Sequence, residues 1–401
     1  MKIVILVSYF QPKLGYQEYY LAKEMQKLGH KVDVVTSNYY FPFPDYKNTV
    51  LKVLGERKRR VGVYREKGVK VHRLRTNWQL KNGSLIILSG VGKKLEKLAP
   101  DVVYCDGVFS YLTIQAAYYK DNLKYKLIYD NHGSPFNTKL RDSLVKKIYM
   151  FTFKNFFIPY IKKRADGYVG IGDSERALFC KEYGLGKSEV KIIRLGADDS
   201  IFYVDKKKRV EMREKLGVRE EEVLLIFAGK ITRDKDINVL FESFRLSLAK
   251  FRKLKLLLVG GGDESAVLNL KKYAKDNNID SRIIWCDSVE SEKLAYYYNA
   301  ADIGCWPGNP SVTIFEGLGC GLPMLLPKRI HISHVSDHFL LNNNGYSIER
   351  GDYKHLAGLI VRLAEDRELR AKMSRRSEKL LIDNYSWEKI AKQFLNLYEE
   401  L

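Results

Sequence analysis

A single carboxylate stands inside the most apolar and glycine-rich segment of the chain. The segment "WPGNPSVTIFEGLGCGLP" (306–323) carries Glu316, with glycines and a proline directly behind it. If Ser311 caps a helix here, the first amides of that helix, those of Val312 and Thr313, are unpaired donors at the positive end of its dipole. Such a helix start suits a phosphate, and Glu316 one turn later can accept hydrogen bonds from a diol such as a ribose. The segment therefore predicts a nucleotide site; the alternative is a glutamate on the surface of an ordinary helix.

Two lysines follow another predicted buried strand. The stretch "FAGKITRDKDINVL" (227–240) joins that strand to a helix and contains Gly229, Lys230 and Lys235. Gly229 permits a close turn, and two ammonium groups at the carboxyl end of a strand suit a diphosphate whose charge increases as it leaves. The "DKD" within this stretch is similar to a metal-binding DxD motif, but its central lysine favours an anion over a cation. Paired lysines in a surface turn are common, so this motif alone is a weak signal.

Two further candidates lie in the N-terminal half. In "FQPKLGYQEYY" (10–20), Gly15 lies between a strand and a helix, where backbone amides can meet an anion, although the GxGxxG dinucleotide fingerprint is absent. In "LIYDNHGSPFN" (127–137), His132 ends a strand; the alternative is a histidine that only satisfies neighbouring backbone groups. No Ser/His/Asp or Cys/His order stands out, so nucleophilic hydrolysis has no support.

The elements that position these residues follow from the pattern of apolar residues. Short Val/Ile-rich runs alternate with helical patterns, which predicts an α/β fold with parallel sheets covered by helices. Ligands of such sheets bind at the carboxyl ends of the strands, and we expect two crevices that face each other across a cleft. The charged segment 203–222 is interpreted as a linker between the halves. The predicted strands are 2–8, 31–37, 69–74, 101–106, 126–131, 167–172, 190–196, 222–229, 254–262, 282–287, 302–307 and 323–327, and the predicted helices are 16–29, 107–120, 207–216, 237–250, 264–277, 291–300, 312–319 and 353–401, the last broken near 384–387.

Composition limits the class of protein. With 401 residues, of which 45% are hydrophobic and 29% charged, the chain is long enough for two globular domains and too apolar for a disordered protein. The apolar start of the chain is too short to span a bilayer and ends at Gln11-Pro12 without a cleavage site, so it predicts a first strand. The five cysteines form no CxxC pair and favour a reducing, cytoplasmic location.

The positive charge is concentrated in the N-terminal half. Of the formal net charge of +21, residues 1–200 contribute 36 Lys+Arg against 19 Asp+Glu, and residues 52–75 alone hold ten basic and two acidic residues. Such a field attracts anionic lipids, phosphate-bearing substrates or nucleic acid; the alternative is a solvated charged surface. The segment "KKIYMFTFKNFFIPYIKKR" (146–164), aromatic at its centre and basic at both ends, is typical of a helix on an anionic membrane surface or of a core helix with basic ends.

Taken in order along the chain, these pieces resemble the retaining glycosyltransferases of family 4, which have the GT-B fold. The resemblance covers nearly the whole chain, with departures at Tyr16 and Asp236, where a glycine is usual, at Leu195, where an asparagine is common, and at Lys230, where an arginine is usual. The strongest part is the family pattern of two glutamates eight residues apart, of which Glu316 matches the second and Gly308 replaces the first. The other matching segments are "LGYQEYYLAKEMQKLGHKVDVVT", "IYDNHG", "RADGYVGIGDSERALFCKEYGL", "IIRLGADDSIF", "FAGKITRDKDINVLFESF", "NNNGYSIERGDYKHLAGLI" and "YSWEKIAKQFLNLYEE".

The resemblance implies a role for each candidate residue. Lys230 and Lys235 would bind the donor diphosphate, and Glu316 would bind the donor ribose. His132 would touch the donor sugar near the reacting carbon. The diphosphate would also meet Gly15 and the first amides of the helix at 312–313. Because the family uses its first glutamate on the donor sugar, Gly308 leaves the identity of that sugar open, with Asn309, Ser311 or Thr313 as substitute contacts.

The resemblance also implies the architecture and the reaction. Residues 1–202 would form an N-terminal Rossmann-like acceptor-side domain and 203–384 a C-terminal Rossmann-like nucleotide-sugar domain, with the helix at 385–401 crossing back to the first. We expect a cytoplasmic, metal-independent and cofactor-free enzyme of polysaccharide or glycolipid biosynthesis. It would move a sugar from a UDP- or GDP-sugar to a glycan or lipid-linked acceptor with retention.

Other readings stay open. An epimerase of UDP-sugars or a phosphorylase on the same architecture is the enzymatic alternative, and a non-enzymatic polyanion-binding protein is another. Nucleic acid is not expected as a partner, because no RNA- or DNA-reading motif is present.

Overall fold

The chain folds into two compact units. The computed structural model describes residues 1–43, 45–80, 85–107, 109–133, 148–149, 151–262, 264–309, 312–330 and 335–401. The first unit comprises Met1–Arg194 together with Ile390–Leu401, and the second comprises Leu195–Lys389. The sequence analysis placed these divisions at residues 202 and 384, so the segment 195–202 belongs to the second unit.

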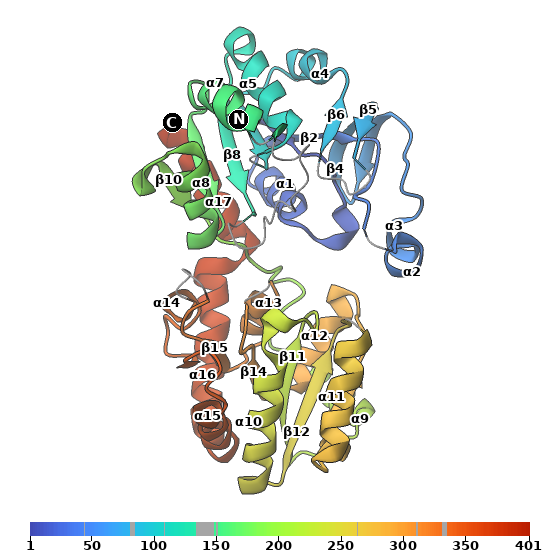
Figure 1. Cartoon of the computed structure of the whole chain (residues 1–401), viewed down its shortest axis with the longest axis vertical. Helices are drawn as coiled ribbons and strands as arrows, with labels where there is room; N and C mark the ends of the chain where they lie inside the picture. The colour runs from blue at the N-terminus through green and yellow to red at the C-terminus, as the bar shows by residue number, and fades with distance from the viewer. Residues whose placement is uncertain are drawn as a thin grey trace. The chain divides into compact units, whose positions relative to one another are not determined.

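The first unit is built on an eight-stranded sheet (Figure 1). Its order is β10-β9-β8-β7-β1-β2-β4-β3, with every neighbouring pair parallel except β3 and β4. The strands are β1 (Lys2–Leu6), β2 (Lys31–Ser37), β3 (Gly62–Glu66), β4 (Val69–Leu74), β7 (Val102–Asp106), β8 (Lys126–Asn131), β9 (Gly167–Gly170) and β10 (Val190–Ile192), with a separate hairpin of β5 (Thr76–Gln79) and β6 (Ile86–Leu88). The helices are α1 (Gln17–Lys27), α2 (Tyr46–Thr49), α3 (Leu51–Leu54), α4 (Val91–Leu98), α5 (Tyr111–Leu123), α7 (Ile158–Lys162) and α8 (Asp173–Tyr183).

The second unit is built on a parallel six-stranded sheet in the order β13-β12-β11-β14-β15-β16. Helix α10 packs against α15, and α9 packs against α12. The strands are β11 (Val223–Ala228), β12 (Leu254–Val259), β13 (Ile283–Cys286), β14 (Ile303–Cys305), β15 (Met324–Pro327) and β16 (Gly345–Ile348). The helices are α9 (Lys206–Lys215), α10 (Ile237–Lys250), α11 (Glu264–Asp276), α12 (Ser291–Ala300), α13 (Thr313–Gly319), α14 (Ser336–Phe339), α15 (Tyr353–Glu365) and α16 (Arg367–Leu380), followed by α17 (Trp387–Glu400), whose last residues belong to the first unit.

Both central sheets are buried on their two faces, which explains the sequence pattern. Every residue of β11 is buried, and so are the last four residues of β1. A parallel strand covered on both sides reads as a continuous apolar run, and each run predicted as a strand forms one. Among the described strands, β3, β5, β6 and β16 were not predicted; β6 is apolar but only three residues long. In β3 the side chains alternate between intermediate and exposed, as on an edge strand with little apolar cover.

The interpretation of 203–222 as a linker is wrong. This segment contains α9, which packs in the second unit, and Arg213 on that helix is buried. Arg209 and Arg213 donate hydrogen bonds to the two carboxylate oxygens of Asp302, at 2.7 and 3.0 Å. Two of the charged residues that suggested a linker therefore form ion pairs with Asp302, the residue just before β14.

The end of α17 packs on the sheet of the first unit. The ring of Phe394 contacts that of Tyr104 on β7, with centroids 5.5 Å apart. The ammonium of Lys126, the first residue of β8, donates to the carbonyl oxygen of Tyr398 at 2.9 Å. Burial of Ile390 and Phe394 fixes this helix as part of the first unit's core.

Candidate active site

In the second unit, the loops that follow β11 and β14 are joined at the carboxyl edge of the sheet. These strands are hydrogen-bonded neighbours, so their ends lie side by side. The ammonium of Lys235 donates to the carbonyl oxygen of Asn309 at 2.8 Å, and the backbone N–H of Asn309 donates to the carbonyl oxygen of Asp234 at 2.8 Å. Lys230, just after the end of β11, is exposed. The structure thus brings both predicted lysines to the loop that leads toward α13.

Lys235 is the more constrained of the two lysines. Burial lowers its pKa, the Asp234 carboxylate acts in the opposite direction, and the positive charge of Lys230 lowers it further. The ammonium therefore lies in a partly desolvated place next to another cation. An arriving phosphate would relieve this repulsion, which is the electrostatic signature of a prepared anion site.

Gly308 leaves no room for a side chain. A Cβ at this position would lie 2.3 Å from the carbonyl carbon of Lys235 and 2.5 Å from the carbonyl oxygen of Asp234. The loop after β11 therefore occupies the space where the family pattern has its first glutamate. Of the substitute contacts, Asn309 uses its backbone N–H and its side-chain amide on Asp234, at 2.8 and 3.1 Å, and Ser311 lies outside the described residues.

Helix α13 is held against the end of β11 by its first residue. It begins at Thr313, with Val312 as its N-cap residue and no capping side-chain hydrogen bond. Ser311, the predicted cap, lies outside the described residues. The Thr313 hydroxyl donates to the carbonyl oxygen of Ala228 at 2.9 Å and accepts from the indole N–H of Trp306 at 3.0 Å. These contacts place the start of α13 beside Gly229, which follows Ala228 with a φ of 143°.

The glycines around Glu316 serve packing. A Cβ at Gly317 would lie 2.8 Å from the Trp306 ring, and one at Gly304 would lie 2.5 Å from it. Gly319 packs on the backbone of Phe202, whose carbonyl oxygen would be 2.4 Å from an added Cβ. The unusual glycine content of this segment therefore lets α13 lie directly over a fully buried tryptophan.

Glu316 lies one turn into α13 and accepts a hydrogen bond from the Tyr298 hydroxyl at 3.1 Å. Burial raises the pKa of its carboxyl to about 7, and this hydrogen bond opposes the shift. Near neutral pH the group is consequently divided between its acid and carboxylate forms. Ligand hydroxyls that donate to the carboxylate would favour ionisation, so this acid is well placed to bind a diol.

The "DKD" stretch does not form a shared carboxylate site. The side chain of Asp234 accepts hydrogen bonds from Thr232 and from the Asn309 amide. The side chain of Asp236 accepts from the Arg350 guanidinium, with one contact of 3.1 Å. Within the described ranges, no group of three or more His, Cys, Asp or Glu side chains has the arrangement to hold a metal ion.

Gly15 and His132 lie in the first unit, at the carboxyl edge of its sheet. Gly15 has a φ of 64° and ends the short 3₁₀ turn that connects β1 to α1. The imidazole of His132, just after β8, lies 3.2 Å from the Asp130 carboxylate and is 34% exposed. Burial lowers the pKa of His132, but the Asp130, Asp106 and Glu18 carboxylates outweigh it and raise the pKa to about 10. The imidazole therefore keeps its proton at neutral pH and acts as a hydrogen-bond donor.

The sequence analysis did not identify the carboxylates around His132. Asp106 and Asp130 are register partners at the ends of β7 and β8, and Glu18 lies in the first turn of α1. Burial and the neighbouring Asp106 carboxylate raise the pKa of Glu18 to about 7, although His132 opposes this. Asp130 is buried and accepts hydrogen bonds from Gln17, at 2.7 Å, and from Tyr104. The signal was available, because both aspartates end Val/Ile-rich runs at the edge where ligands bind.

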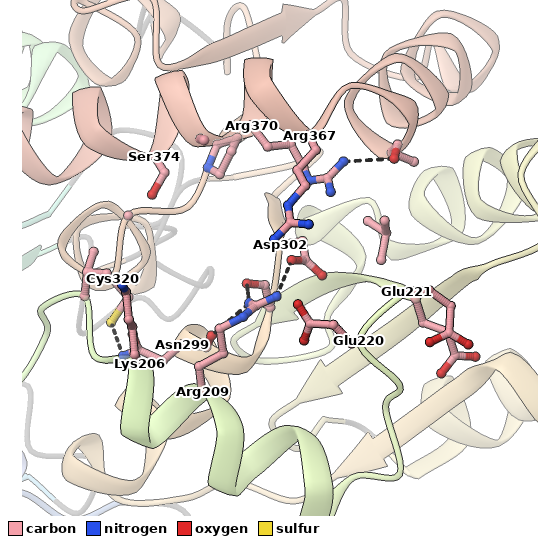
Figure 2. Close-up of a pocket in the computed structure, with 18 of the residues that line it drawn as sticks. Lys206, Arg209, Glu220, Glu221, Asn299, Asp302, Cys320, Arg367, Arg370 and Ser374 are labelled. Atoms are coloured by element: carbon pink, nitrogen blue, oxygen red, sulfur yellow. Dashed lines mark hydrogen bonds and ion pairs between the residues drawn. The ribbon is translucent and has the colours of Figure 1, made fainter.

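A cavity of about 640 Å³ also lies in the second unit, at the opposite edge of the sheet (Figure 2). Its lining includes Val223, which begins β11, and Asp302, which precedes β14. Figure 2 shows basic and acidic side chains interspersed around it, among them the ion pair of Arg209 with Asp302. Because these charges neutralise one another within the wall, the cavity gives no indication of an anion site.

Comparisons with known proteins match the sequence of both halves of the chain. The profile described as Glycosyltransferase Family 4 matches residues 17–201, and that described as Glycosyl transferases group 1 matches residues 208–380. An uncharacterized glycosyltransferase of Methanocaldococcus jannaschii is 21% identical over 94% of this chain and 92% of its own. A D-inositol 3-phosphate glycosyltransferase of Xylanimonas cellulosilytica is 23% identical over 59% of this chain and 57% of its own.

Solved structures show the same fold. HepE of Anabaena, crystallised with UDP, superimposes with a TM-score of 0.72 at 16% identity over the whole of both chains. The lipopolysaccharide-biosynthesis glycosyltransferase WaaG superimposes with a TM-score of 0.61 at 14% identity over 99% of both chains. At these identities the likeness concerns the fold.

Proposed function

The chain has the GT-B fold and belongs to the family 4 glycosyltransferases, and from this premise we propose that it transfers a sugar from a nucleotide-diphosphate sugar to a glycan or lipid-linked acceptor with retention of anomeric configuration. The observation that supports the proposal most strongly is that the loops after β11 and β14 are hydrogen-bonded to each other at the carboxyl edge of the second unit's sheet. There Lys235 binds the backbone of Asn309, and Glu316 lies one turn into the helix that follows. This is the edge where parallel sheets bind ligands, and its groups match the parts of a nucleoside diphosphate.

Each part of the donor has a contact in this arrangement. The ammonium groups of Lys230 and Lys235 would face the diphosphate, helped by the backbone N–H groups of Val312 and Thr313. The carboxylate of Glu316 would accept hydrogen bonds from the ribose hydroxyls. UDP or GDP is the proposed nucleotide, and HepE, which shares the fold, was crystallised with UDP.

The proposed reaction needs no group that becomes bonded to the sugar. The bond between the anomeric carbon and the diphosphate oxygen breaks, and the acceptor oxygen forms a new bond to the same face of that carbon. The hydroxyl proton of the acceptor passes to the departing diphosphate. The two lysines stabilise the negative charge that grows on the leaving group, which lowers the barrier of this step.

The residues of the first unit would orient the sugars. Because His132 is protonated at neutral pH, it would donate a hydrogen bond to the donor sugar. Glu18 and Asp106, whose pKa values are both raised by burial, would accept hydrogen bonds from sugar hydroxyls. We include in the proposal that domain closure gates the reaction.

We also propose a cytoplasmic location with attachment to an anionic membrane surface through the segment 146–164, of which residues 146, 147 and 150 lie outside the described residues. Phe153, Ile158 and Ile161 on this segment are buried, whereas Phe151 and Phe156 are each 66% exposed. Exposed aromatic rings beside lysines are typical of a surface-binding helix. Among the described residues, no helix combines the length and the apolar character needed to cross a bilayer. Flotation with vesicles that contain or lack phosphatidylglycerol tests the attachment; equal flotation with both contradicts it.

Product analysis tests the reaction itself. Nucleotide sugars are incubated with the protein and candidate acceptors in the presence of EDTA, and released nucleotide and new glycoside are measured together. We expect acceptor-dependent release that survives the chelator, with the anomeric configuration of the donor preserved in the proton NMR spectrum. Conversion of a UDP-sugar without acceptor would indicate an epimerase, and turnover only with pyridoxal phosphate would indicate a phosphorylase. Salt-sensitive polyanion binding without any turnover would indicate a binding protein.

A further inference from the structure

A second cavity, of about 550 Å³, lies wholly within the first unit and is lined by cations. It sits where β2 and β4 end, at the carboxyl edge that also carries Gly15 and His132. Four basic side chains line it, those of Lys58, Arg59, Arg60 and Arg75, and within the described part of the chain no acidic residue does.

Among the described residues, no carboxylate pairs with the cations that line this cavity. In the described ranges, none of the four forms an ion pair, and all four are exposed. Arg73, which lies on β4 shortly before Arg75, has its own partner, because it donates two hydrogen bonds of 2.7 Å to the carboxylate of Glu66. This wall differs from the mixed cavity of the second unit, where acidic and basic side chains pair with each other.

The backbone that presents these cations is fixed. Asn38 is buried, and its side-chain amide donates to the carbonyl oxygen of Arg59 at 3.1 Å. Its side-chain oxygen accepts from the backbone N–H of Thr76 at 3.0 Å. Asn38 therefore fastens the segment carrying Lys58 to the loop that follows β4, and the positive charges are assembled before any ligand arrives.

One residue that lines the cavity has a hydroxyl group without a hydrogen-bond partner among the described residues. The hydroxyl oxygen of Thr76, one of the lining residues, is buried and makes no hydrogen bond to any described residue. A buried hydroxyl without a partner is costly, but this oxygen has almost no accessible surface, so the Thr76 side chain would have to rotate before a ligand oxygen in the cavity could bond to it. Four unpaired cations call for a ligand with more than one negative charge, which favours a phosphate over a single carboxylate.

We propose that this cavity binds a phosphate or pyrophosphate group of the acceptor substrate, an assignment that rests on the proposed glycosyl transfer. Neighbouring strands lie about 4.8 Å apart. The ends of β2 and β4 are three and four strands from β8, so the cavity lies roughly 14–19 Å across the sheet from His132. The phosphate and the reacting hydroxyl therefore belong to different parts of the acceptor.

Calorimetric titration with inorganic pyrophosphate tests the cavity. The full chain carries Lys235→Ala in every sample, so that phosphate binding in the second unit is weakened. In this background Arg60→Glu with Arg75→Glu should weaken pyrophosphate binding at least tenfold. The control pair, Lys31→Glu with Lys97→Glu, makes the same change in net charge at exposed positions, one at the start of β2 on the opposite edge of the sheet and one in the last turn of α4, and it should leave the affinity within twofold.

Two results overturn the proposal. Equal weakening by both pairs would show that only the general positive field attracts the anion, and no weakening by the cavity pair would show that pyrophosphate binds elsewhere. Should the glutamate pair fail to fold by circular dichroism, Arg60→Gln with Arg75→Gln provides the same comparison with a smaller expected loss. Unchanged binding in that folded pair would overturn the proposal as well.

Two further measurements identify the source of the phosphate and separate this proposal from the proposed function. Flotation on phosphatidylglycerol vesicles that is lost with the Arg60 and Arg75 changes would assign the phosphate to a lipid headgroup. Pyrophosphate binding without such a loss would assign it to a soluble phosphorylated acceptor. In the chain with native Lys235, nucleotide-induced thermal stabilisation should be unaffected by the cavity changes. If no nucleotide stabilises the chain at all, the proposed glycosyltransferase function is contradicted, while the pyrophosphate titration still tests the cavity.

Discussion

The carboxyl edges of the two sheets have the same architecture but opposite chemistry. In the second unit the edge presents the ammonium groups of Lys230 and Lys235, and its loops meet so closely that Gly308 cannot carry a side chain. In the first unit the part of the corresponding edge at β7 and β8 presents Glu18, Asp106 and a protonated histidine. The cations of the proposed phosphate cavity lie farther along the same edge, where β2 and β4 end. The difference shows that a parallel sheet fixes only where ligands bind; the residues that end its strands decide whether the edge binds phosphate or hydroxyl groups.

The largest expected effect concerns the cationic edge. Lys235→Ala should lower turnover about 10²-fold or more, because it removes a positive charge at the developing anion. Steady-state release of nucleotide from the donor sugar measures it. Lys250→Ala, at the far end of α10, is the control and should change the rate little. A Lys235→Ala enzyme within a few-fold of the wild type would remove the distinction between the two edges.

Glu316 should make donor binding depend on pH. With a pKa of about 7, the carboxyl group is mostly protonated at pH 6 and mostly ionised at pH 8. If the carboxylate binds the ribose, the affinity for the nucleotide should rise about tenfold over this range and level off above it. Calorimetry at several pH values measures the rise, and Glu316→Gln should remove it. A variant that keeps the same slope would place the titration in the nucleotide phosphate and not in Glu316.

The same raised pKa predicts a loss of stability with rising pH. The folded chain holds the Glu316 proton up to about pH 7, whereas a glutamate in the unfolded chain, with its ordinary pKa of 4.5, releases it earlier. The free energy of unfolding contributed by this group therefore falls between about pH 4.5 and pH 7. Urea titrations of the wild type and Glu316→Gln across this range should diverge at the upper end, with the variant retaining more stability.

The close packing of Gly308 against the loop after β11 predicts a smaller effect, on the free energy of unfolding. Gly308→Ala should lower the free energy of unfolding by about 1–3 kcal/mol, because the added methyl group overlaps the backbone of Asp234 and Lys235. Gly358→Ala is a matched control in α15, where an added Cβ meets nothing within 4 Å, and should be neutral or slightly stabilising. Urea unfolding compares the two. Equal stabilities would mean that the loop after β11 moves freely and that position 308 is open to a donor-sugar contact.

The smallest effect concerns the carboxylate edge. The imidazole of His132 has a pKa of about 10 in the folded chain and an ordinary pKa of 6.5 when unfolded. Its contribution to stability is therefore complete below pH 6.5 and is lost as the pH rises through about 10. Asp130→Asn removes the nearest opposite charge and should lower the pKa of His132 by about 1–3 units. NMR titration of the imidazole, identified by its loss in His132→Gln, measures the shift. An unchanged pKa would mean that the carboxylates of this edge do not control the histidine.

How far the sequence predicts this molecule depends on whether a feature is local. The buried strands follow from their apolar runs, and the pairing of Lys235 with the segment that contains Glu316 follows from two strand ends on one edge. The role of α9 does not, because its charges become an ion-pair network only when Asp302 lies beside Arg209 and Arg213.

Features that join distant segments were missed for a related reason. Asp106 and Asp130 are 24 positions apart in the numbering and become neighbours only through the register of β7 with β8. The basic run at 52–75 predicted that the chain attracts anions. Which of its cations line one cavity depends on the hydrogen bonds of Asn38 to the backbone of Arg59 and Thr76, which the sequence does not show. The sequence reveals that Gly308 replaces a glutamate, and the structure adds that the neighbouring loop occupies the glutamate's space.

The central claim is that the carboxyl edge of the second unit binds a nucleoside diphosphate. Thermal unfolding with a panel of nucleoside diphosphates and nucleotide sugars, applied to the wild type, Lys235→Ala, Glu316→Ala and the Lys250→Ala control, tests it most directly. We expect at least one nucleotide to raise the melting temperature of the wild type and the control, and to raise it far less in the other two variants. A wild type that no nucleotide stabilises, or a stabilisation that is equal in all four proteins, would contradict the claim.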